Sequence, residues 1–325
     1  MRSPRTGRVL LALLCAQATA TASPPPAAVE TPDAAAGTAA TVAAEPAARW
    51  RLGANAGFEI DDDIAGATDF RSYSFGLQVE YGNWLLGAST SWVEIDGPQI
   101  LLGDIRLPDR LRQALDDAGL TIADVVDQRS ADKSASGVGD VLLRLAHAWP
   151  EQRAWPFVEL EGTVKLPTAD ENDLLGTGKV DFTLEVEVAK TFGVLTPFAA
   201  GGVVFYGSPV TQPAFFVDTA IGPVRIPASR VDLDPAFYVT AGVDWQVLRA
   251  LDIGVMYDWS QSPVAGVADS HEMLPYASLQ LGPRVRLAPY LVIGLSREAP
   301  DYGFAMQIVF SYEPASAATS PRAAD

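Results

Sequence analysis

Apolar and polar residues alternate one by one along several segments of the chain. Between residues 180 and 190, valine, phenylalanine and leucine occupy every second position, and aspartate, threonine and glutamate fill the positions between them. Residues 155–166, 236–248 and 250–261 show the same alternation. A period of two residues indicates β-strands that have one apolar and one polar face.

Twelve segments of this kind are predicted, and the connections between them alternate in length. The predicted strands cover residues 50–60, 72–81, 84–95, 138–149, 155–166, 180–191, 195–207, 236–248, 250–261, 274–286, 289–298 and 303–312. Tight turns are expected around Gly82, residues 150–154, Gly193, Arg249 and Ala288. The other loops, at 61–71, 96–137, 167–179, 208–235 and 262–273, are long, and the loop at 299–302 is short.

This pattern predicts an all-β fold, an antiparallel up-and-down transmembrane β-barrel of about 12 strands with short periplasmic turns and long extracellular loops. No later segment has the roughly 18–20 consecutive apolar residues of a transmembrane helix, and a closed barrel also pairs every backbone group within lipid. The competing interpretation is a soluble β-sandwich whose aromatic residues fill a core. The aromatic residues favour the barrel, because all seven tryptophans lie at or near predicted strand ends, as do Tyr73, Tyr81, Tyr206, Tyr257, Tyr290 and Tyr312.

Composition predicts the segments that flank the barrel at 49–313. Residues 1–22 combine three arginines with an apolar run and a final Ala-Thr-Ala, which indicates a secretory signal peptide that is cleaved after Ala22. The single cysteine, Cys15, leaves with it, so no disulfide or thiol site is expected. Residues 23–48 are predicted to be an Ala/Pro-rich disordered leader, and 314–325 a disordered tail.

The charge balance is strongly acidic. The formal net charge is -17, and removal of the three arginines of the signal peptide leaves 20 basic and 40 acidic side chains, a net charge of -20. Such a surface repels nucleic acid. The partners expected of the predicted barrel are instead the lipid bilayer of a bacterial outer membrane and a small-molecule solute.

If the apolar faces meet lipid, the polar faces line the lumen. In a simple hairpin register between the strands that end at Leu166 and begin at Val180, Glu159 and Glu161 face Glu187 and Glu185, and Lys165 faces Asp181. Arg144, on the neighbouring strand, is the nearest cation to this carboxylate patch. The patch is predicted either to favour cations and neutral solutes over anions or to be an ordinary ion-paired interior. The candidate lumen residues are Glu59, Glu80, Asp140, Arg144, Glu159, Glu161, Lys165, Asp181, Glu185, Glu187, Asp244, Asp252, Asp258, Arg284 and Arg286.

No catalytic residue, metal site or cofactor is expected. His147 is predicted to pack at the membrane interface near a strand end. His271 follows Asp269 and Ser270 in an outer loop, an arrangement that could activate water in a hydrolase. The chain has no zinc-ligand spacing and no glycine-rich loop that opens a helix.

Three motifs carry a resemblance to a known family. Gly137-Val138-Gly139-Asp140 opens a strand, Lys165-Leu166-Pro167-Thr168 ends the next, and residues 175–181, Leu-Gly-Thr-Gly-Lys-Val-Asp, open a third. Over residues 137–207 the chain resembles the MetA-pathway of phenol degradation family, although Ala169 stands where that family commonly has glycine. The resemblance implies an outer-membrane barrel that acts as a channel for aromatic compounds. The motif residues expected to shape the loop rather than bind a substrate are Gly137, Gly139, Pro167, Thr168, Gly176 and Gly178.

The sequence therefore predicts an outer-membrane channel or transporter for small molecules. A structural or adhesive barrel without transport and a membrane-embedded hydrolase are the alternatives. About 12 strands lies between the filled eight-stranded and the open sixteen-stranded barrels. The insert at 96–137 is predicted to form short helices, which either plug the lumen or cap the barrel from outside.

Overall fold

The computed structural model describes most of the predicted barrel. The described residues are 50–64, 68–96, 134–169, 175–176, 178–207, 210–212, 215–219, 222–226, 229–230, 233–264, 267–296 and 299–313. The predicted signal peptide, leader, tail and helices of the insert lie outside these residues.

The described residues form strands that run up and down in chain order. Their bounds are β1 Trp50–Ile64, β2 Thr68–Tyr81, β3 Trp84–Asp96, β4 Ala135–Val138, β5 Val141–Trp149, β6 Phe157–Leu166, β7 Asp181–Ala189, β8 Leu195–Phe205, β9 Val210–Gln212, β10 Phe215–Thr219, β11 Gly222–Ile226, β12 Ser229–Arg230, β13 Ala236–Leu248, β14 Leu251–Ser260, β15 Ser270–Gln280, β16 Val285–Gly294 and β17 Tyr302–Tyr312. Across these described ranges, no helix is long and apolar enough to span a membrane.

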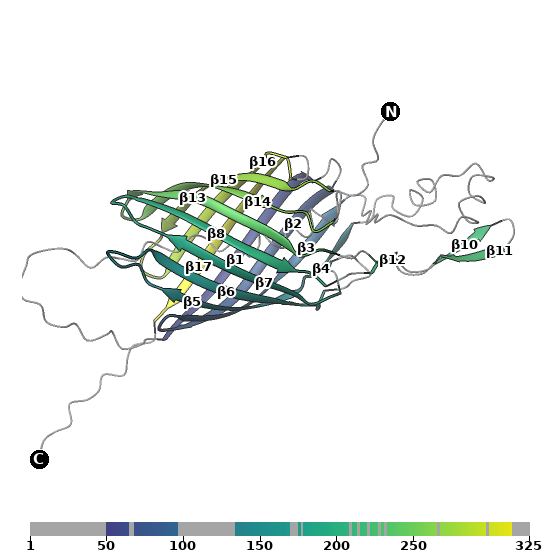
Figure 1. The fold of residues 1–325 in the computed structure, drawn as a ribbon, viewed down its shortest axis with the longest axis horizontal. Helices are drawn as coiled ribbons and strands as arrows, with labels where there is room; N and C mark the ends of the chain where they lie inside the picture. The colour runs from purple at the N-terminus through teal and green to yellow at the C-terminus, as the bar shows by residue number, and fades with distance from the viewer. Residues whose placement is uncertain are drawn as a thin grey trace, which may run out of the picture.

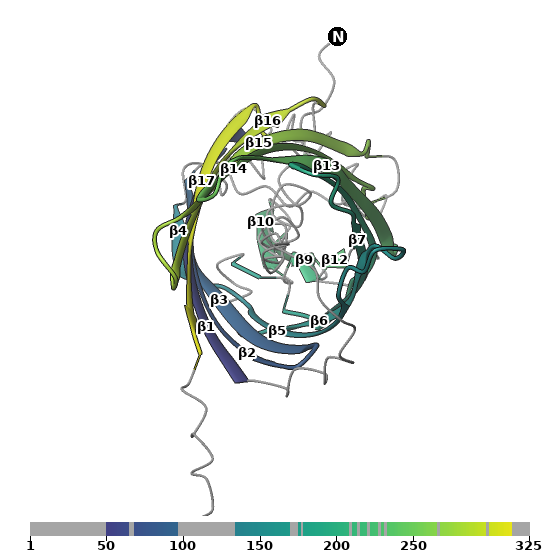
Figure 2. The same ribbon diagram turned by 90° about the vertical axis from the view of Figure 1, so that its left-hand side faces the viewer.

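The strands close into one antiparallel barrel (Figures 1 and 2). The sheet order is β2-β1-β17-β16-β15-β14-β13-β8-β7-β6-β5-β3-β4, and the pairing of β2 with β3 completes the ring. Since β4 and β5 pair with successive parts of β3, they act as one wall strand interrupted at residues 139–140. The wall therefore has 12 strands, as the sequence predicts. The short strands β9–β12 form two separate two-stranded sheets.

Side chains alternate between the two surfaces of the wall. On β7, the apolar residues from Phe182 to Val188 are exposed on the outside, and Asp181 and Ala189 are buried. Large apolar side chains are also exposed on the outside of the other wall strands, among them Leu77, Leu86 and Phe310. A closed sheet whose outer face is apolar and whose lumen is polar is the arrangement of a membrane-spanning barrel.

The two ends of the barrel differ in the length of their connections. At one end, called here the inner end, the strands are joined by residues 82–83, 150–156, 190–194, 249–250 and 281–284, and residues 50 and 313 lie there too. At the other, called the outer end, the connections are residues 65–67, 97–134, 167–180, 206–235, 261–269 and 295–301. The first is short, so the long loop predicted at 61–71 is wrong, whereas the others, except 295–301, are longer than any at the inner end. Short turns mark the periplasmic side of outer-membrane barrels and long loops the extracellular side.

The structure corrects the predicted bounds of two strands near the end of the barrel. The predicted strands at 274–286 and 289–298 are instead Ser270–Gln280 and Val285–Gly294. The expected turn at Ala288 is wrong, because Ala288 is buried within β16 and the turn lies at residues 281–284, where Gly282 has φ of 94°. Only glycine adopts this conformation without strain.

The correction also moves a tyrosine. Tyr290, expected in an aromatic girdle, lies in the middle of β16 and pairs with Tyr276 of β15. Other aromatic residues do lie exposed at the inner end, where Trp50 packs on Tyr81 with ring centroids 4.4 Å apart. Trp84 contacts His147 at 4.4 Å, and His147 contacts Trp149 at 4.5 Å. His147 therefore packs among aromatic rings near a strand end, as expected.

Candidate functional site

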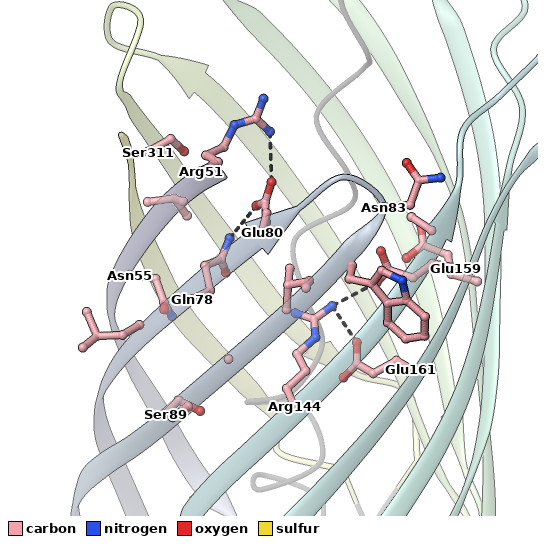
Figure 3. Close-up of a pocket in the computed structure, with 18 of the residues that line it drawn as sticks. Arg51, Asn55, Gln78, Glu80, Asn83, Ser89, Arg144, Glu159, Glu161 and Ser311 are labelled. Atoms are coloured by element: carbon pink, nitrogen blue, oxygen red, sulfur yellow. Dashed lines mark hydrogen bonds and ion pairs between the residues drawn. The ribbon is translucent and has the colours of Figure 1, made fainter. Parts of the chain in front are cut away.

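The inner half of the barrel encloses a cavity of about 580 Å³ (Figure 3). It lies between the wall strands β1–β3 and β5–β7 on one side and β15–β17 on the other. Its charged lining residues are Arg51, Glu80, Arg144, Glu159, Glu161, Glu187, Arg284 and Arg286. A cavity with charged lining residues inside a closed wall could hold a solute.

One wall of the inner half carries an acidic patch, defined as Glu159, Glu161, Glu185 and Glu187, of which all but Glu185 line the cavity. The strands β6 and β7 pair Glu159 with Glu187 and Glu161 with Glu185, which is the register that the alternation predicts. Like charges placed opposite one another destabilise a sheet unless a counter-charge is present. Four carboxylates facing one space therefore need donors from neighbouring strands.

Arg144 of β5 supplies the counter-charge. Its Nη2 lies 3.0 Å from Glu159 Oε1 and 2.5 Å from Glu161 Oε2 (Figure 3). Glu185 accepts a hydrogen bond from the hydroxyl of Tyr238 on β13. Glu187 Oε1 is buried with no hydrogen-bond partner among the described residues. One guanidinium is thus shared by a patch of four carboxylates, which retains a formal negative charge.

The remaining charges of the inner half are distributed around the ring. Arg51 lies 3.0 Å from Glu80 and 2.9 Å from Glu313. Arg286 of β16 interacts electrostatically with Asp252 and Asp244. The four arginines and four glutamates of the lining are thus unevenly placed, with three of the glutamates grouped beside Arg144.

Two other predicted lumen residues have defined contacts. Arg284 lies in the turn rather than in a strand, with its guanidinium carbon 5.3 Å from the centre of the Tyr312 ring. Asp258 of β14 accepts a hydrogen bond from the Thr240 hydroxyl of β13.

The outer half contains a buried ion triad of Asp140, Lys165 and Asp181. Lys165 Nζ lies 3.2 Å from Asp140 Oδ2 and 2.5 Å from Asp181 Oδ2. The backbone N–H groups of Thr168 and Ala169 donate to Asp140 Oδ1, both at 3.0 Å, so Asp140 also holds the start of the following loop. Each charge of this triad is paired, in contrast to those of the acidic patch.

The motif residues lie around this triad. Thr168 Oγ1 accepts a hydrogen bond from the N–H of Val141 at 2.9 Å, and the N–H of Gly139 donates to Ser91 O at 2.7 Å. Pro167 directly follows β6, and Gly178 has φ of 63°. A Cβ on Gly176 would lie 2.9 Å from Asp140 Oδ2. These contacts support a role in loop geometry.

An apolar cluster lies next to the triad on the lumen side of β2 and β3. It consists of Phe70, Val93, Ile95 and Leu175, all buried. Gly137 leaves room for it, since a Cβ there would lie 2.6 Å from Leu175 Cδ1. Leu175 belongs to the loop between β6 and β7, so this loop places a side chain inside the barrel.

A second cluster of carboxylates was only partly predicted from the sequence. Glu59, Asp61 and Glu272 are buried, and they interact electrostatically. Asp61 and Glu272 fall in segments that were predicted to be loops, although the alternation of Glu59, Ile60 and Asp61 would have extended the strand correctly. No group of three or more His, Cys, Asp or Glu side chains within the described ranges is placed to hold a metal ion.

The arrangement around His271 does not support the hydrolase alternative. His271 Nδ1 lies 2.6 Å from the Tyr257 hydroxyl. Asp269 instead accepts hydrogen bonds from Trp259 Nε1 at 3.2 Å and from the N–H of Ser262 at 3.1 Å. The carboxylate is thus engaged by other residues than the imidazole that it would have to orient.

Comparisons with known proteins identify the architecture. No family model and no curated protein matches the chain. Among solved structures, the COG4313 outer membrane channel from Pseudomonas putida F1 is similar with a TM-score of 0.54 and 14% identity, over 83% of this chain and 97% of that one. The CymD monoaromatic hydrocarbon channel gives a TM-score of 0.42 at 10% identity, covering 82% and 88%. The P. putida toluene transporter TodX gives 0.40 at 10% identity, covering 83% and 90%.

The fold is a closed antiparallel β-barrel like that of the COG4313 outer membrane channel. The structural alignment with the COG4313 channel covers 83% of this chain and 97% of that one, so it includes most of the barrel. At this identity the likeness concerns the fold alone, so the solute has to be argued from the cavity.

Proposed function

We propose that this protein resides in a bacterial outer membrane and is a channel for small solutes. The observation that carries the proposal is the charged cavity of about 580 Å³ within a closed wall whose outside is apolar. A membrane barrel that served only as an anchor would not need to leave solvated carboxylates around an internal space, because a filled interior is more easily stabilised.

The charge of the cavity indicates which solutes pass. The acidic patch exceeds its single counter-charge, Arg144, so the field at this level favours cations and neutral molecules over anions. The resemblance to the MetA-pathway of phenol degradation family points to neutral aromatic or hydrophobic compounds as the cargo. The acidic patch disfavours anions at this level of the cavity, and the resemblance supports a neutral cargo.

Planar bilayer recordings test the channel and its charge preference together. Under a KCl gradient we expect a reversal potential that indicates preference for K⁺. Arg144→Gln should increase this preference, and the double variant Glu159→Gln with Glu187→Gln should decrease it. Asp96→Asn, an exposed carboxylate at the outer end of β3, is the matched control and should leave the potential unchanged. A wild-type protein that passes neither ions nor solutes contradicts the proposal.

A structural or adhesive barrel is the second candidate. The observation that favours it is the burial of inward-facing side chains in the outer half, including Ile95, Lys165 and Glu272. The two candidates differ in one measurable property, since a sealed barrel carries no current and lets no solute through in either direction.

A further inference from the structure

The seam between β15 and β16 is interrupted, whereas the ladders on either side of it are continuous. β15 pairs with β14 at every residue from Ser270 to Leu279, and β16 pairs with β17 at every residue from Val285 to Ile293. β15 and β16 pair at Met273↔Ile293 and at Leu279↔Leu287. Between these two positions the only paired residues are Tyr276 and Tyr290.

Two prolines lie in this stretch, one on each strand. Pro275 is in the middle of β15 and Pro289 in the middle of β16. Proline has no backbone N–H and is ordinarily confined to edge strands, strand starts and bulges. The other proline of a described wall strand, Pro197, stands near the start of β8.

Both missing donors belong to the same seam. The N–H of Leu295 donates to His271 O and the N–H of Leu281 donates to Val285 O, each at 2.8 Å, so odd-numbered residues of both strands direct their backbone groups across the seam. By contrast, Gln280 donates to Ala250 at 2.9 Å, toward β14. Pro275 and Pro289 are odd-numbered. Two consecutive hydrogen-bonded positions of one seam therefore each lack a donor.

The continuation of the register shows which acceptors lose a partner. Pro275 stands across from Leu291, and Pro289 across from Ala277. The carbonyl groups of Leu291 and Ala277 thus receive no ladder hydrogen bond at these positions. In a wall that faces lipid, the loss of a backbone hydrogen bond is costly, because hydrocarbon offers no replacement donor. This seam is consequently held by fewer backbone hydrogen bonds than the two ladders beside it.

The inner cavity reaches the beginning of this stretch. Gln280 and Arg286 pair across the seam and both line the cavity. The next inward-facing pair toward the outer end is Ser278 with Ala288, two small residues, followed by Tyr276 with Tyr290. The Tyr276 hydroxyl donates to Asp244 at 2.5 Å, which directs it along the wall interior.

We propose that the β15–β16 seam is a lateral exit through which neutral apolar solutes pass between the inner cavity and the bilayer. The inference rests on the proposed channel function and deepens it by naming a route and a solute class. On the lipid side the stretch presents Ala277, Pro289 and Leu291, and on the lumen side aromatic rings and Ala288, so the route is apolar. An apolar molecule that leaves sideways is transferred directly into hydrocarbon, where its free energy is lowest.

A disulfide across the seam tests the exit. Ser278→Cys with Ala288→Cys, in a Cys15→Ser background, places two cysteines on facing inward positions that do not exchange ladder bonds. The matched control is Thr183→Cys with Val204→Cys, the same kind of inward pair on the uninterrupted β7–β8 seam. The readout is uptake of the neutral aromatic dye 1-N-phenylnaphthylamine by Gram-negative cells that express the protein, alongside K⁺ conductance of the purified protein.

We expect oxidation of the seam pair to abolish protein-dependent dye uptake, reduction to restore it, and the K⁺ conductance to stay unchanged. The control pair should affect neither. Unchanged uptake with the seam cross-linked, or equal loss with the control pair, overturns the lateral exit while leaving the channel intact. Absence of both dye uptake and conductance in the uncross-linked parent contradicts the proposed function instead.

A second variant keeps the test decisive if the cysteine pair folds poorly. Pro275→Ala with Pro289→Ala returns two N–H donors to the seam, so uptake should slow and the unfolding temperature should rise. Pro197→Ala is its control, because that proline lies on another seam near a turn. Faster or unchanged uptake in the double variant overturns the proposal.

Discussion

The inner and outer halves of the barrel follow the same alternation of side chains but treat their inward-facing charges differently. In the inner half, Arg144 pairs with two of the four carboxylates of the acidic patch, Glu159 and Glu161, at the edge of a cavity. In the outer half, Asp140, Lys165 and Asp181 are each 6% exposed, and Lys165 lies between the two carboxylates.

The difference shows that the energetic cost of an unpaired charge depends on its exposure to solvent. Glu159, Glu161 and Glu187 line a cavity in which solvent can screen like charges, although Glu161 is itself only 8% exposed. Where water is excluded, an unpaired charge costs several kcal/mol and pairing becomes necessary. The outer half accordingly pairs its buried charges, whereas the inner half keeps more carboxylates than Arg144 neutralises beside the cavity.

The largest expected effect comes from breaking the outer triad. Lys165→Met should lower the free energy of unfolding by about 3–5 kcal/mol, because it leaves two buried carboxylates without their cation. Urea unfolding in detergent, followed by tryptophan fluorescence, measures this. Arg249→Met, an exposed cation in the β13–β14 turn of the inner end, is the control and should cost less than about 1 kcal/mol. Equal losses in both variants would refute the contrast between the halves.

Removing the apolar contact beside the triad should have the next largest effect. Leu175→Ala deletes a side chain that is 2% exposed, so a loss of about 2–3 kcal/mol is expected from the cavity that it leaves. The same unfolding assay applies. Leu184→Ala, which removes an exposed leucine from the outside of β7, provides the comparison. A smaller loss for Leu175→Ala than for Leu184→Ala would show that the cluster does not hold the loop.

A smaller effect is expected from crowding the same cluster. Gly137→Ala adds a Cβ that would lie 2.6 Å from Leu175 Cδ1, which should cost about 1–2 kcal/mol in the native protein. In the Leu175→Ala background the added methyl group meets open space and should cost less. A double-mutant cycle measures this coupling, and purely additive losses would indicate that the two positions do not meet.

The smallest expected effect lies in a turn of the inner end. Glu151 Oε1 is 3.0 Å from Lys190 Nζ and also accepts from the N–H of Thr191. Although partial burial raises the pKa of Glu151, these hydrogen bonds and the charge of Lys190 outweigh it, and its pKa is lowered below the usual 4.5.

A lowered carboxylate pKa contributes stability above the unfolded-state pKa, and this contribution is lost as the pH falls through the folded value. Glu151→Gln should therefore be less stable than wild type by under about 1 kcal/mol at pH 7, and the difference should vanish in acid. Unfolding temperatures at several pH values measure it. A difference that grows toward low pH would contradict this assignment.

The sequence by itself determined the wall and much of its lining. Alternation is a local property, and because one face must meet lipid it specifies both the strands and their register. For this reason Glu159, Glu161 and Lys165 face the partners that the pattern predicted. The same logic fails where a strand contains a proline, and Pro289 was therefore taken as a strand start although the Gly282-Pro283 turn precedes it.

Only the tertiary structure decided which inward-facing charges are buried and which border a cavity. A strand of this period looks the same whether its polar face meets water or protein, since burial depends on the strands and loops across the barrel. Nor does the chain order show that Pro275 and Pro289 weaken one common seam, because that follows from the pairing register and the direction of backbone groups on two neighbouring strands. The alternation of residues determines which side chains share one face of a strand, whereas the closure of the sheet determines what that face contacts.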